Sequence, residues 1–274
     1  MIPLHSHFRR RLRAFFLQLA GSLILLCCSS AGDPPKKNLT IFAASSLRPV
    51  FQALKKKFER HYPSIDVKLQ FAGSQRLQLQ ISEGARPQLF ATAHPRHVRA
   101  LSELDLIDAP RPLAFGRLAL AVPRKNPSQL KNFSDLARAR CLLIAGPEVP
   151  VGRYARKFLE RAEDQLGVAL TTRLIRERCS DESSARLVRA KLLLAEADAG
   201  LIYESDLLRD RDGAPEPRLK RIPIPAELQR PLIYQIAPLQ NLSVEQAEHV
   251  KHWFGLLKSQ AGHSILKRFG FSPP

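Results

Sequence analysis

The chain has 274 residues, which is long for one hydrophobic core and suits two lobes. Its 45% apolar and 25% charged residues, with 13 glycines and 21 prolines, exclude a disordered or fibrous protein. It carries 43 lysines and arginines against 25 aspartates and glutamates, a net charge of +18. Beyond the N-terminus no apolar run approaches the roughly 20 residues that a membrane-spanning helix needs, so we expect a soluble body.

The first 28 residues have the pattern of an export signal. Four arginines between residues 9 and 13 precede an apolar run from Phe15 to Cys28, and this order is typical of a secretory signal peptide. The run ends in Leu-Leu-Cys-Cys-Ser, which resembles a lipobox with Cys28 as the lipidated residue, whereas residues 29–31 offer an ordinary cleavage site. Both alternatives predict an exported protein of the periplasm or cell envelope, and in the lipobox alternative a lipid on Cys28 is its sole contact with the membrane.

The basic charge does not by itself identify a partner. Loss of the signal segment removes four arginines and no acidic residue, so the mature charge is about +14. Such a charge suits nucleic acid, an anionic membrane surface or an anionic ligand. Export argues against nucleic acid, as does the absence of a helix-turn-helix, zinc-finger or aromatic-interleaved basic motif. A basic membrane-facing surface remains an alternative to anion binding.

The folded part begins with a strand and an amphipathic helix. Residues 39–44 are rich in the side chains that favour strands, and they lead to Ser46, which we expect to cap the helix. The helix itself is predicted from apolar residues at four-residue spacing, Val50, Leu54 and Phe58. These residues make one strand–turn–helix unit.

The same order of strand, small polar turn and helix recurs along the chain. Residues 67–72 alternate as a strand and end at Gly73 and Ser74, and a second strand over 141–145 precedes a glycine- and proline-rich turn. A later helix opens at Ala185 and leads into a strand over 200–203. Alternating strands and helices of this length predict an α/β architecture with mainly parallel sheets.

The turns share a chemistry that suits an anion. Each helix N-terminus presents free amides and a partial positive charge, and three of the turns add serine hydroxyls. The first helical turns also carry basic residues where acidic ones are usual. These are Arg48, Arg76, Arg153 and Arg186. We interpret them either as counterions of a bound anion or as chance placements in a basic chain.

Cys141 and Cys179 are the cysteines that remain after the signal segment. Each lies at the edge of a strand-like run, so the pair can form a disulfide in an oxidising compartment. The alternative is that each is a separate small apolar residue.

No sequence motif indicates catalysis. A nucleophile elbow, a phosphate-binding loop and a zinc-protease pattern are all absent. His94 with His97 and His249 with His252 have a three-residue spacing, but neither pair has a third metal ligand nearby. We therefore expect solvated surface histidines, no metal site, no cofactor and no enzymatic activity.

Six segments of the chain resemble a known family in the same order. They are Phe42–Leu47, Phe71–Ser74, Gln80–Ala85, Gly146–Ala155, Gly200–Asp206 and Leu266–Phe271. They resemble the periplasmic molybdate-binding proteins of bacterial ABC transporters, which belong to the type II periplasmic solute-binding family. The similarity runs from Leu39 to Phe271, nearly the whole mature chain.

The resemblance implies a two-lobe type II periplasmic-binding fold. Its two α/β lobes enclose a ligand cleft and are joined by two crossing strands, here expected over 118–122 and 232–237. On this basis residues 38–116 and 232–274 form the first lobe, and residues 117–231 form the second. A helix with a capping-box start at Ser243 and Gln246 would return to the first lobe.

The resemblance also implies a function and a set of ligand residues. A monomer of this family captures molybdate or tungstate and delivers it to the ABC permease in the membrane. The implied donors are the hydroxyls and amides of Ser46 and Ser74, the amides of Val151 and Ala185, and the phenol of Tyr203. Another oxyanion such as sulfate or phosphate, or an anion sensor unconnected with transport, remains an alternative.

Overall fold

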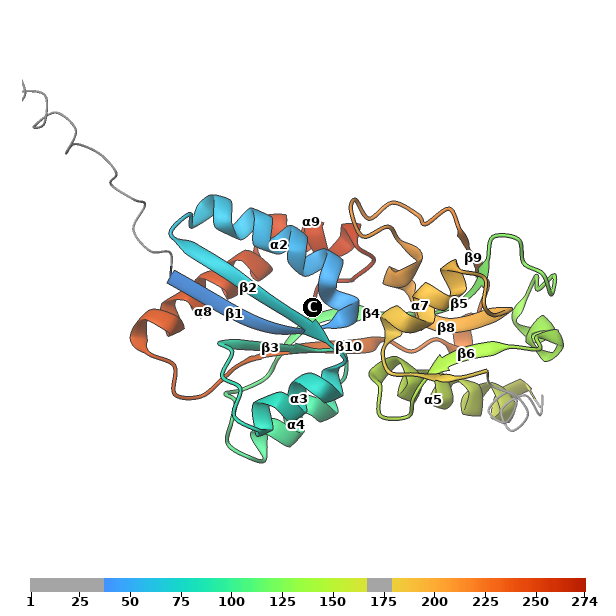
Figure 1. The fold of residues 1–274 in the computed structure, drawn as a ribbon, viewed down its shortest axis with the longest axis horizontal. Helices are drawn as coiled ribbons and strands as arrows, with labels where there is room; N and C mark the ends of the chain where they lie inside the picture. The colour runs from blue at the N-terminus through green and yellow to red at the C-terminus, as the bar shows by residue number, and fades with distance from the viewer. Residues whose placement is uncertain (1–36, 167–178) are drawn as a thin grey trace, which may run out of the picture. The chain divides into compact units, whose positions relative to one another are not determined.

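The computed structural model describes residues 37–166 and 179–274, of which Lys37–Pro274 belong to one compact unit (Figure 1). Cys28 and the predicted signal segment lie outside the described residues. The part of the chain that is described contains no helix long and apolar enough to cross a membrane.

The first of two five-stranded sheets has the strand order β2-β1-β3-β10-β4. Its strands are β1 (Lys37–Ala44), β2 (Ile65–Ala72), β3 (Leu89–Thr92), β4 (Arg111–Gly116) and β10 (Leu232–Pro238). β1 pairs in parallel with β2 and β3, whereas β10 is antiparallel to both β3 and β4.

The second sheet has the order β7-β6-β8-β5-β9. Its strands are β5 (Leu118–Pro123), β6 (Leu142–Ala145), β7 (Asp181–Glu182), β8 (Ala199–Tyr203) and β9 (Leu219–Ile222). β6 is parallel to β7 and β8, and β5 is antiparallel to β8 and β9.

The expectation of mainly parallel sheets is wrong, because each sheet is mixed. Arg117 alone separates β4 from β5, so the chain passes from one sheet to the other without a helix. Parallel neighbours need a long crossover connection, usually a helix, and a strand that arrives directly from the other sheet has none. β5 and β10 therefore pair antiparallel with the strands on both sides of them.

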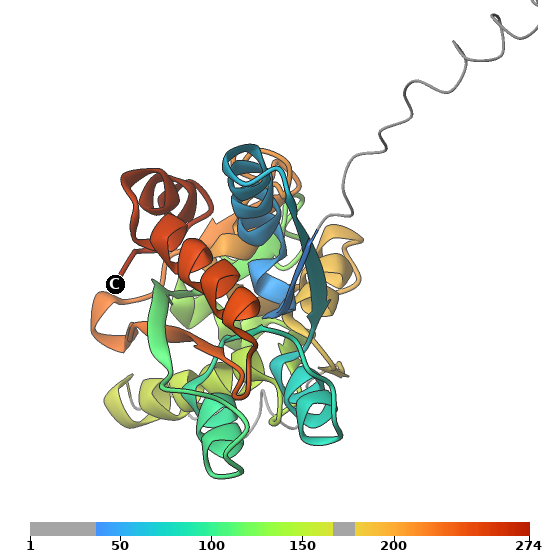
Figure 2. The same ribbon diagram turned by 90° about the vertical axis from the view of Figure 1, so that its left-hand side faces the viewer.

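Helices cover both faces of the first sheet (Figure 2). α2 (Arg48–His61) and α8 (Val244–Lys258) lie on one face, and α9 (Gln260–Arg268) packs against both of them. α3 (Ser74–Ser82) and α4 (Pro95–Ser102) lie on the other face, beside each other. Both faces of β1 and β3 are thereby removed from water.

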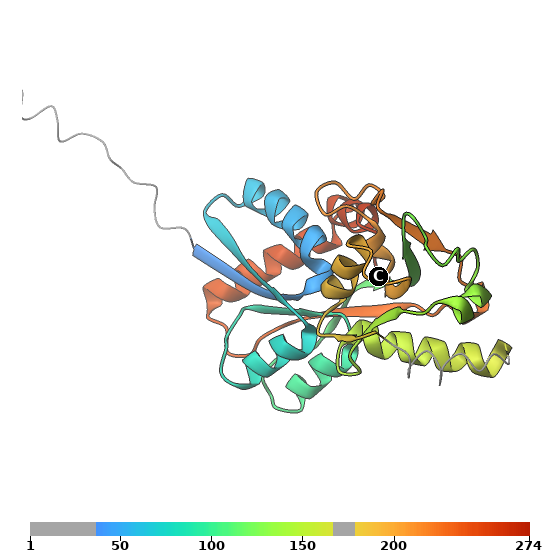
Figure 3. The same cartoon turned by 45° about the vertical axis from the view of Figure 1, so that its right-hand side comes forward.

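The second sheet lies between α5 (Pro150–Leu166) and α7 (Ala185–Leu193) (Figure 3). Short 3-10 helices complete the described part. They are η1 (Ser45–Leu47), η2 (Phe133–Arg138), η3 (Glu204–Leu207) and η4 (Ala226–Leu228).

The apolar face predicted for α2 is confirmed. Val50, Leu54 and Phe58 are buried against the first sheet. Phe58 also packs on Trp253 of α8, with 5.3 Å between the ring centroids. Burial of each such side chain contributes roughly 1.5–3 kcal/mol, so this face fixes α2 and with it the turn that precedes it.

The two predicted helix caps have opposite outcomes. The capping box of Ser243 and Gln246 is confirmed at the start of α8. The cap predicted at Ser46 is wrong, because a 3-10 turn over Ser45–Leu47 precedes α2 and no side chain caps that helix. The Ser46 hydroxyl thus remains available for another role.

The expected surface histidines are instead largely buried. His97 is 0% exposed and its Nδ1 lies 2.7 Å from Gln78 Oε1, while His249 is 7% exposed. His97 lies on the same face of the short helix α4 as Val98 and Leu101, so packing of that face buries it. In the described residues, no group of three histidines, cysteines or carboxylates is placed to hold a metal ion.

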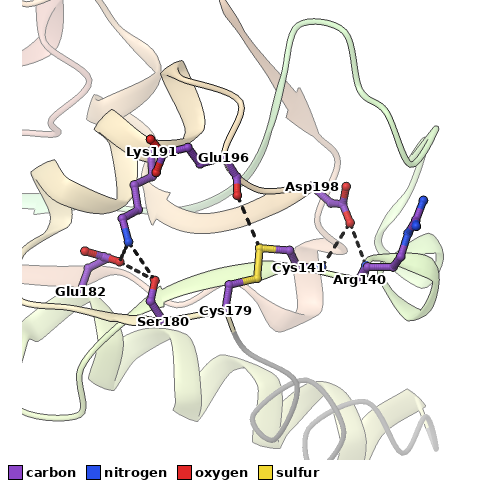
Figure 4. Close-up of a disulfide and its surroundings, with 8 residues drawn as sticks. All are labelled: Arg140, Cys141, Cys179, Ser180, Glu182, Lys191, Glu196 and Asp198. Atoms are coloured by element: carbon purple, nitrogen blue, oxygen red, sulfur yellow. Dashed lines mark hydrogen bonds and ion pairs between the residues drawn. A yellow bond between two sulfur atoms is a disulfide. The ribbon is translucent and has the colours of Figure 1, made fainter.

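A disulfide joins Cys141 and Cys179 at the edge of the second sheet, with Cα atoms 5.4 Å apart (Figure 4). The backbone amides of Arg140 and Cys141 donate to the Asp198 carboxylate at 2.8 and 3.2 Å. On the other side, Glu182 accepts from Lys191 at 2.6 Å. Polar contacts therefore hold both chain segments next to the disulfide.

Removal of this disulfide is expected to lower the stability of the protein. The link closes a loop with a sequence separation of 38 residues, and loss of such a restraint on the unfolded chain costs about 4 kcal/mol. For a chain of this size the Tm should fall by about 8–16 °C. Thermal unfolding of the wild type and of Cys141→Ala/Cys179→Ala measures this. A reductant should lower the Tm of the wild type alone, and equal effects on both proteins would contradict the prediction.

Acid should destabilise the protein through His97. Burial lowers the pKa of His97 to about 3, against about 6.5 in an unfolded chain. Between these values the unfolded state binds the extra proton, so the free energy of unfolding falls as the pH decreases. Between pH 7 and pH 5 the wild type should lose about 2 kcal/mol more than His97→Gln. Urea denaturation at both pH values tests this, and equal losses in the two proteins would refute it.

Candidate functional site

Four of the five predicted ligand residues line one small pocket between elements of the two sheets. Ser46, Ser74, Ala185 and Tyr203 all contribute to its wall. Val151 does not, although its neighbours Val149 and Pro150 do. Residues from widely separated parts of the chain thus meet at one point.

Three helices begin at this pocket. Ser74 is the first residue of α3, Pro150 begins α5 and Ala185 begins α7. The first amides of a helix have no partner within the helix and carry a partial positive charge. Val151 lies in the first turn of α5, where such amides occur, but it is buried and is not part of the pocket wall.

Local sequence explains why these helices begin where they do. Gly73 directly follows β2 and is the N-cap of α3. The Ser184 side chain accepts from the amide of Leu187 and so caps α7. The first turn follows β2 and the second follows β7, so their amides lie at the end of a strand in each sheet.

The serine hydroxyls are buried and free to donate. Ser74 Oγ accepts from the amide of Ala93 at 3.2 Å, which leaves its proton for another acceptor. Ser46 Oγ is buried and has no hydrogen-bond partner in the described residues. A buried polar group without a partner costs roughly 1–3 kcal/mol, so a bound acceptor would remove this cost at Ser46.

Tyr203 remains a neutral phenol at any ordinary pH. Its side chain is buried, and burial raises its pKa well above the usual value. Its backbone amide donates to the carboxylate of Asp206 at 3.2 Å, which anchors the end of β8. The phenol is therefore a fixed neutral donor on the second-sheet side of the pocket.

The pocket is small and its wall carries no charged side chain among the described residues. The space inside is about 10 Å³, room for the centre of about one water-sized group. A small, compact ligand that accepts hydrogen bonds fits this arrangement, because the wall offers amides and hydroxyls.

The arginines of the first helical turns do not enter the pocket. Arg48 lies over the ring of Phe71, at 4.5 Å from its centroid, and Arg186 donates to Asp210 at 3.0 Å. The pocket wall includes none of Arg48, Arg76, Arg153 and Arg186. The interpretation of these residues as direct counterions is therefore wrong, since none of the four lies in the wall.

A buried carboxylate lies behind the second-sheet side of the pocket. Asp206 follows Tyr203 in η3, and burial raises its pKa to about 6. Arg186 lies 3.9 Å from it, and the side chain of Arg189 donates to its backbone oxygen at 2.7 Å. These arginines partly offset the cost of burying the carboxylate.

Two contacts join elements of the two sheets beside the pocket. Gln75 of α3 donates to the Ser183 backbone oxygen, just before α7, at 3.2 Å. The ring of His94, which caps α4, lies 5.0 Å from the ring of Tyr154 in α5. Burial, followed by the charge of Arg153, lowers the pKa of His94 to about 4, so this contact involves a neutral ring at neutral pH.

Sequence reasoning missed several residues of the pocket wall. They are Ala44, Ser45, Gly73, Ala93, Val149, Pro150 and Ser184. Most of them adjoin a residue that was predicted, so the available signal was their place in the same turns. Ala93 had no such signal, because its contact with Ser74 depends on the pairing of β1 with β2 and β3.

Comparison with known proteins agrees with this fold. The family described as bacterial extracellular solute-binding protein matches residues 39–272. The molybdate-binding protein ModA of Mycobacterium tuberculosis is 29% identical over 250 residues, which cover 90% of this chain and 89% of ModA.

Two solved structures share the fold at low sequence identity. The periplasmic molybdate-binding protein of Azotobacter vinelandii has a TM-score of 0.74 at 20% identity, over 86% of this chain and 99% of its own. The sulfate-binding protein SubI of Mycobacterium tuberculosis has a TM-score of 0.72 at 12% identity, over 86% of this chain and 87% of its own. The two-lobe periplasmic-binding architecture is thereby confirmed.

This family consists of solute-binding proteins and is not an enzyme family. Its description as extracellular implies that its members are exported. With a match over residues 39–272, the chain belongs to the bacterial extracellular solute-binding proteins.

Proposed function

We propose that the chain captures molybdate or tungstate in the pocket at Ser46, Ser74, Ala185 and Tyr203 and delivers it to the permease of an ABC transporter. Residues 38–116 with 232–274 act as one lobe, and residues 117–231 act as the other. The observation that carries the proposal is a small pocket whose wall offers neutral hydrogen-bond donors and no charged side chain.

Neutral donors suit a tetrahedral oxyanion that carries no proton. Such an anion only accepts hydrogen bonds, and each bond to it contributes roughly 1.5–3 kcal/mol. About six bonds give a gross gain near 9–18 kcal/mol, which desolvation and lost freedom largely offset. The net affinity expected is micromolar to nanomolar.

The names of related proteins favour molybdate over other anions. The Mycobacterium tuberculosis relative, which aligns over 90% of this chain, is named for binding molybdate. Tungstate has the same charge and shape, so a pocket for one should take the other. Because the pocket is small, we expect its size to set the selectivity for molybdate and tungstate over sulfate and phosphate.

Capture would take place outside the cytoplasm. The basic and apolar pattern before residue 28 supports export, and Cys28 supports a lipid that holds the protein at the membrane. We propose that the protein works there as a monomer and without a cofactor, the oxyanion being its cargo.

Sulfate is the second candidate solute, because the SubI structure shares this fold. A sulfate-binding protein would use the same kind of donors in a smaller cavity. An anion sensor without a transport role would bind the same ligands and differ only in its partners.

Thermal unfolding with a panel of anions tests the proposed ligand. Molybdate or tungstate at about a thousand times its Kd should add about 4 kcal/mol and raise the Tm by roughly 8–16 °C. Sulfate and phosphate at equal ionic strength should have little effect. A shift with sulfate alone would keep the fold and change the solute, and no shift with any anion would refute the proposal.

Ser46→Ala and Ser74→Ala should each weaken molybdate binding by at least tenfold, since each removes a buried donor to a charged ligand. Isothermal titration calorimetry measures the Kd, and unfolding without ligand shows whether each variant folds. Ser264→Ala is the matched control, because Ser264 is an exposed serine of α9 that donates to Gln260 at 2.8 Å. Unchanged affinity in both pocket variants would overturn the ligand assignment.

A further inference from the structure

A second tyrosine lies behind the pocket wall. Tyr234 of β10 is fully buried, and its ring centroid is 5.7 Å from that of Tyr203 and 5.2 Å from that of Phe271. A Cβ on Gly116, in the neighbouring strand, would come within 3.0 Å of the Tyr234 ring. Close packing on three sides therefore fixes the direction of the Tyr234 phenol.

The Tyr234 hydroxyl has no formed hydrogen bond within the described residues, and neither does Ser46 Oγ. Burial raises the pKa of Tyr234 well above its usual value, and the nearby hydroxyls of Ser46 and Tyr203 offset part of this rise. The three oxygens thus form one cluster in which the phenol is protonated. Without ligand, two buried hydroxyls of this cluster are left unsatisfied, which is costly.

A bound oxyanion determines the direction of every hydrogen bond in this cluster. An anion without protons accepts only, so the hydroxyls of Ser46 and Tyr203 must turn their protons toward it. Their remaining lone pairs then need a donor. The phenol of Tyr234 has one proton and no hydrogen-bond partner among the described groups, and Ser46 Oγ also lacks a partner there, so Ser46 is the hydroxyl to which Tyr234 can donate.

We propose that Tyr234 is a positioning residue that donates its one proton to the hydroxyl of Ser46, keeps the Ser46 proton directed at the ligand, and so selects oxyanions that carry no proton. The inference rests on the proposed function, because it assigns Ser46 and Tyr203 as ligand donors. It adds a residue that does not line the pocket and acts through those that do.

Selection against protonated anions follows from the same hydrogen-bond directions. Phosphate keeps at least one proton at neutral pH and needs an acceptor in the site. While Tyr234 donates to the hydroxyl of Ser46, a lone pair of that hydroxyl is occupied and its proton points inward. In Tyr234→Phe the Ser46 hydroxyl can rotate and accept a hydrogen bond from a protonated anion, so discrimination against phosphate should weaken.

Tyr234→Phe keeps the ring and removes only the hydroxyl. Molybdate affinity should fall about fivefold, the value of one neutral hydrogen bond, and the ratio of molybdate to phosphate affinity should fall with it. The Tm without ligand should be unchanged or higher, because an unsatisfied buried hydroxyl is gone. Tyr62→Phe is the matched control, since Tyr62 lies outside the pocket and its ring stacks on His252 at 4.4 Å. It should alter neither affinity.

A double-mutant cycle separates positioning from a general structural role. If Tyr234 acts partly through Ser46, Tyr234→Phe should cost clearly less in a Ser46→Ala background than in the wild type. Full additivity of the two substitutions would overturn the inference, as would an unchanged anion ratio in Tyr234→Phe.

The outcomes also distinguish this inference from the proposed function. If Ser46→Ala weakens molybdate binding and Tyr234→Phe does not, the function stands and the inference fails. If neither variant nor Ser74→Ala changes the affinity, the ligand assignment fails and the inference fails with it.

Discussion

The proposed ligand sets one constraint on the structure, because an acceptor held in the pocket has to be surrounded by donors that carry no full charge. The pocket meets it by bringing together the starts of α3, α5 and α7 and the end of β8. Amides at a helix start have no intrahelical partner, so they are available without a separate side chain. The two mixed sheets place these ends at one point, and β5 and β10 join the sheets beside it.

The strong positive charge of the chain is kept outside this pocket. Arg186 follows Ala185 in the first turn of α7, yet its side chain is held by Asp210, and Arg48 is held over Phe71. The wall can close without burying a full positive charge, which would cost several kcal/mol. Basic residues can then serve in long-range attraction of an anion while the pocket itself remains neutral.

Aromatic packing holds two of the buried hydroxyls in place. Tyr203 and Tyr234 come from different sheets, and their rings meet at the junction that β10 forms. Rings held in this way leave the phenols little freedom, so binding would cost less conformational entropy than it would with mobile side chains. A rigid wall also makes cavity size a sharper filter between anions.

The sequence by itself determined the local elements, including the buried face of α2 and the cap at Ser243, which follow from periodicity and turn chemistry within a few residues. The family resemblance supplied the five predicted ligand residues, four of which line the pocket. Tertiary structure alone decided the mixed sheets, the burial of His97 and the place of Tyr234, because each depends on which distant segments pack together. Ser46 illustrates the division. The sequence indicated its turn, whereas only the structure showed that its hydroxyl does not cap α2 and has no hydrogen-bond partner among the described residues.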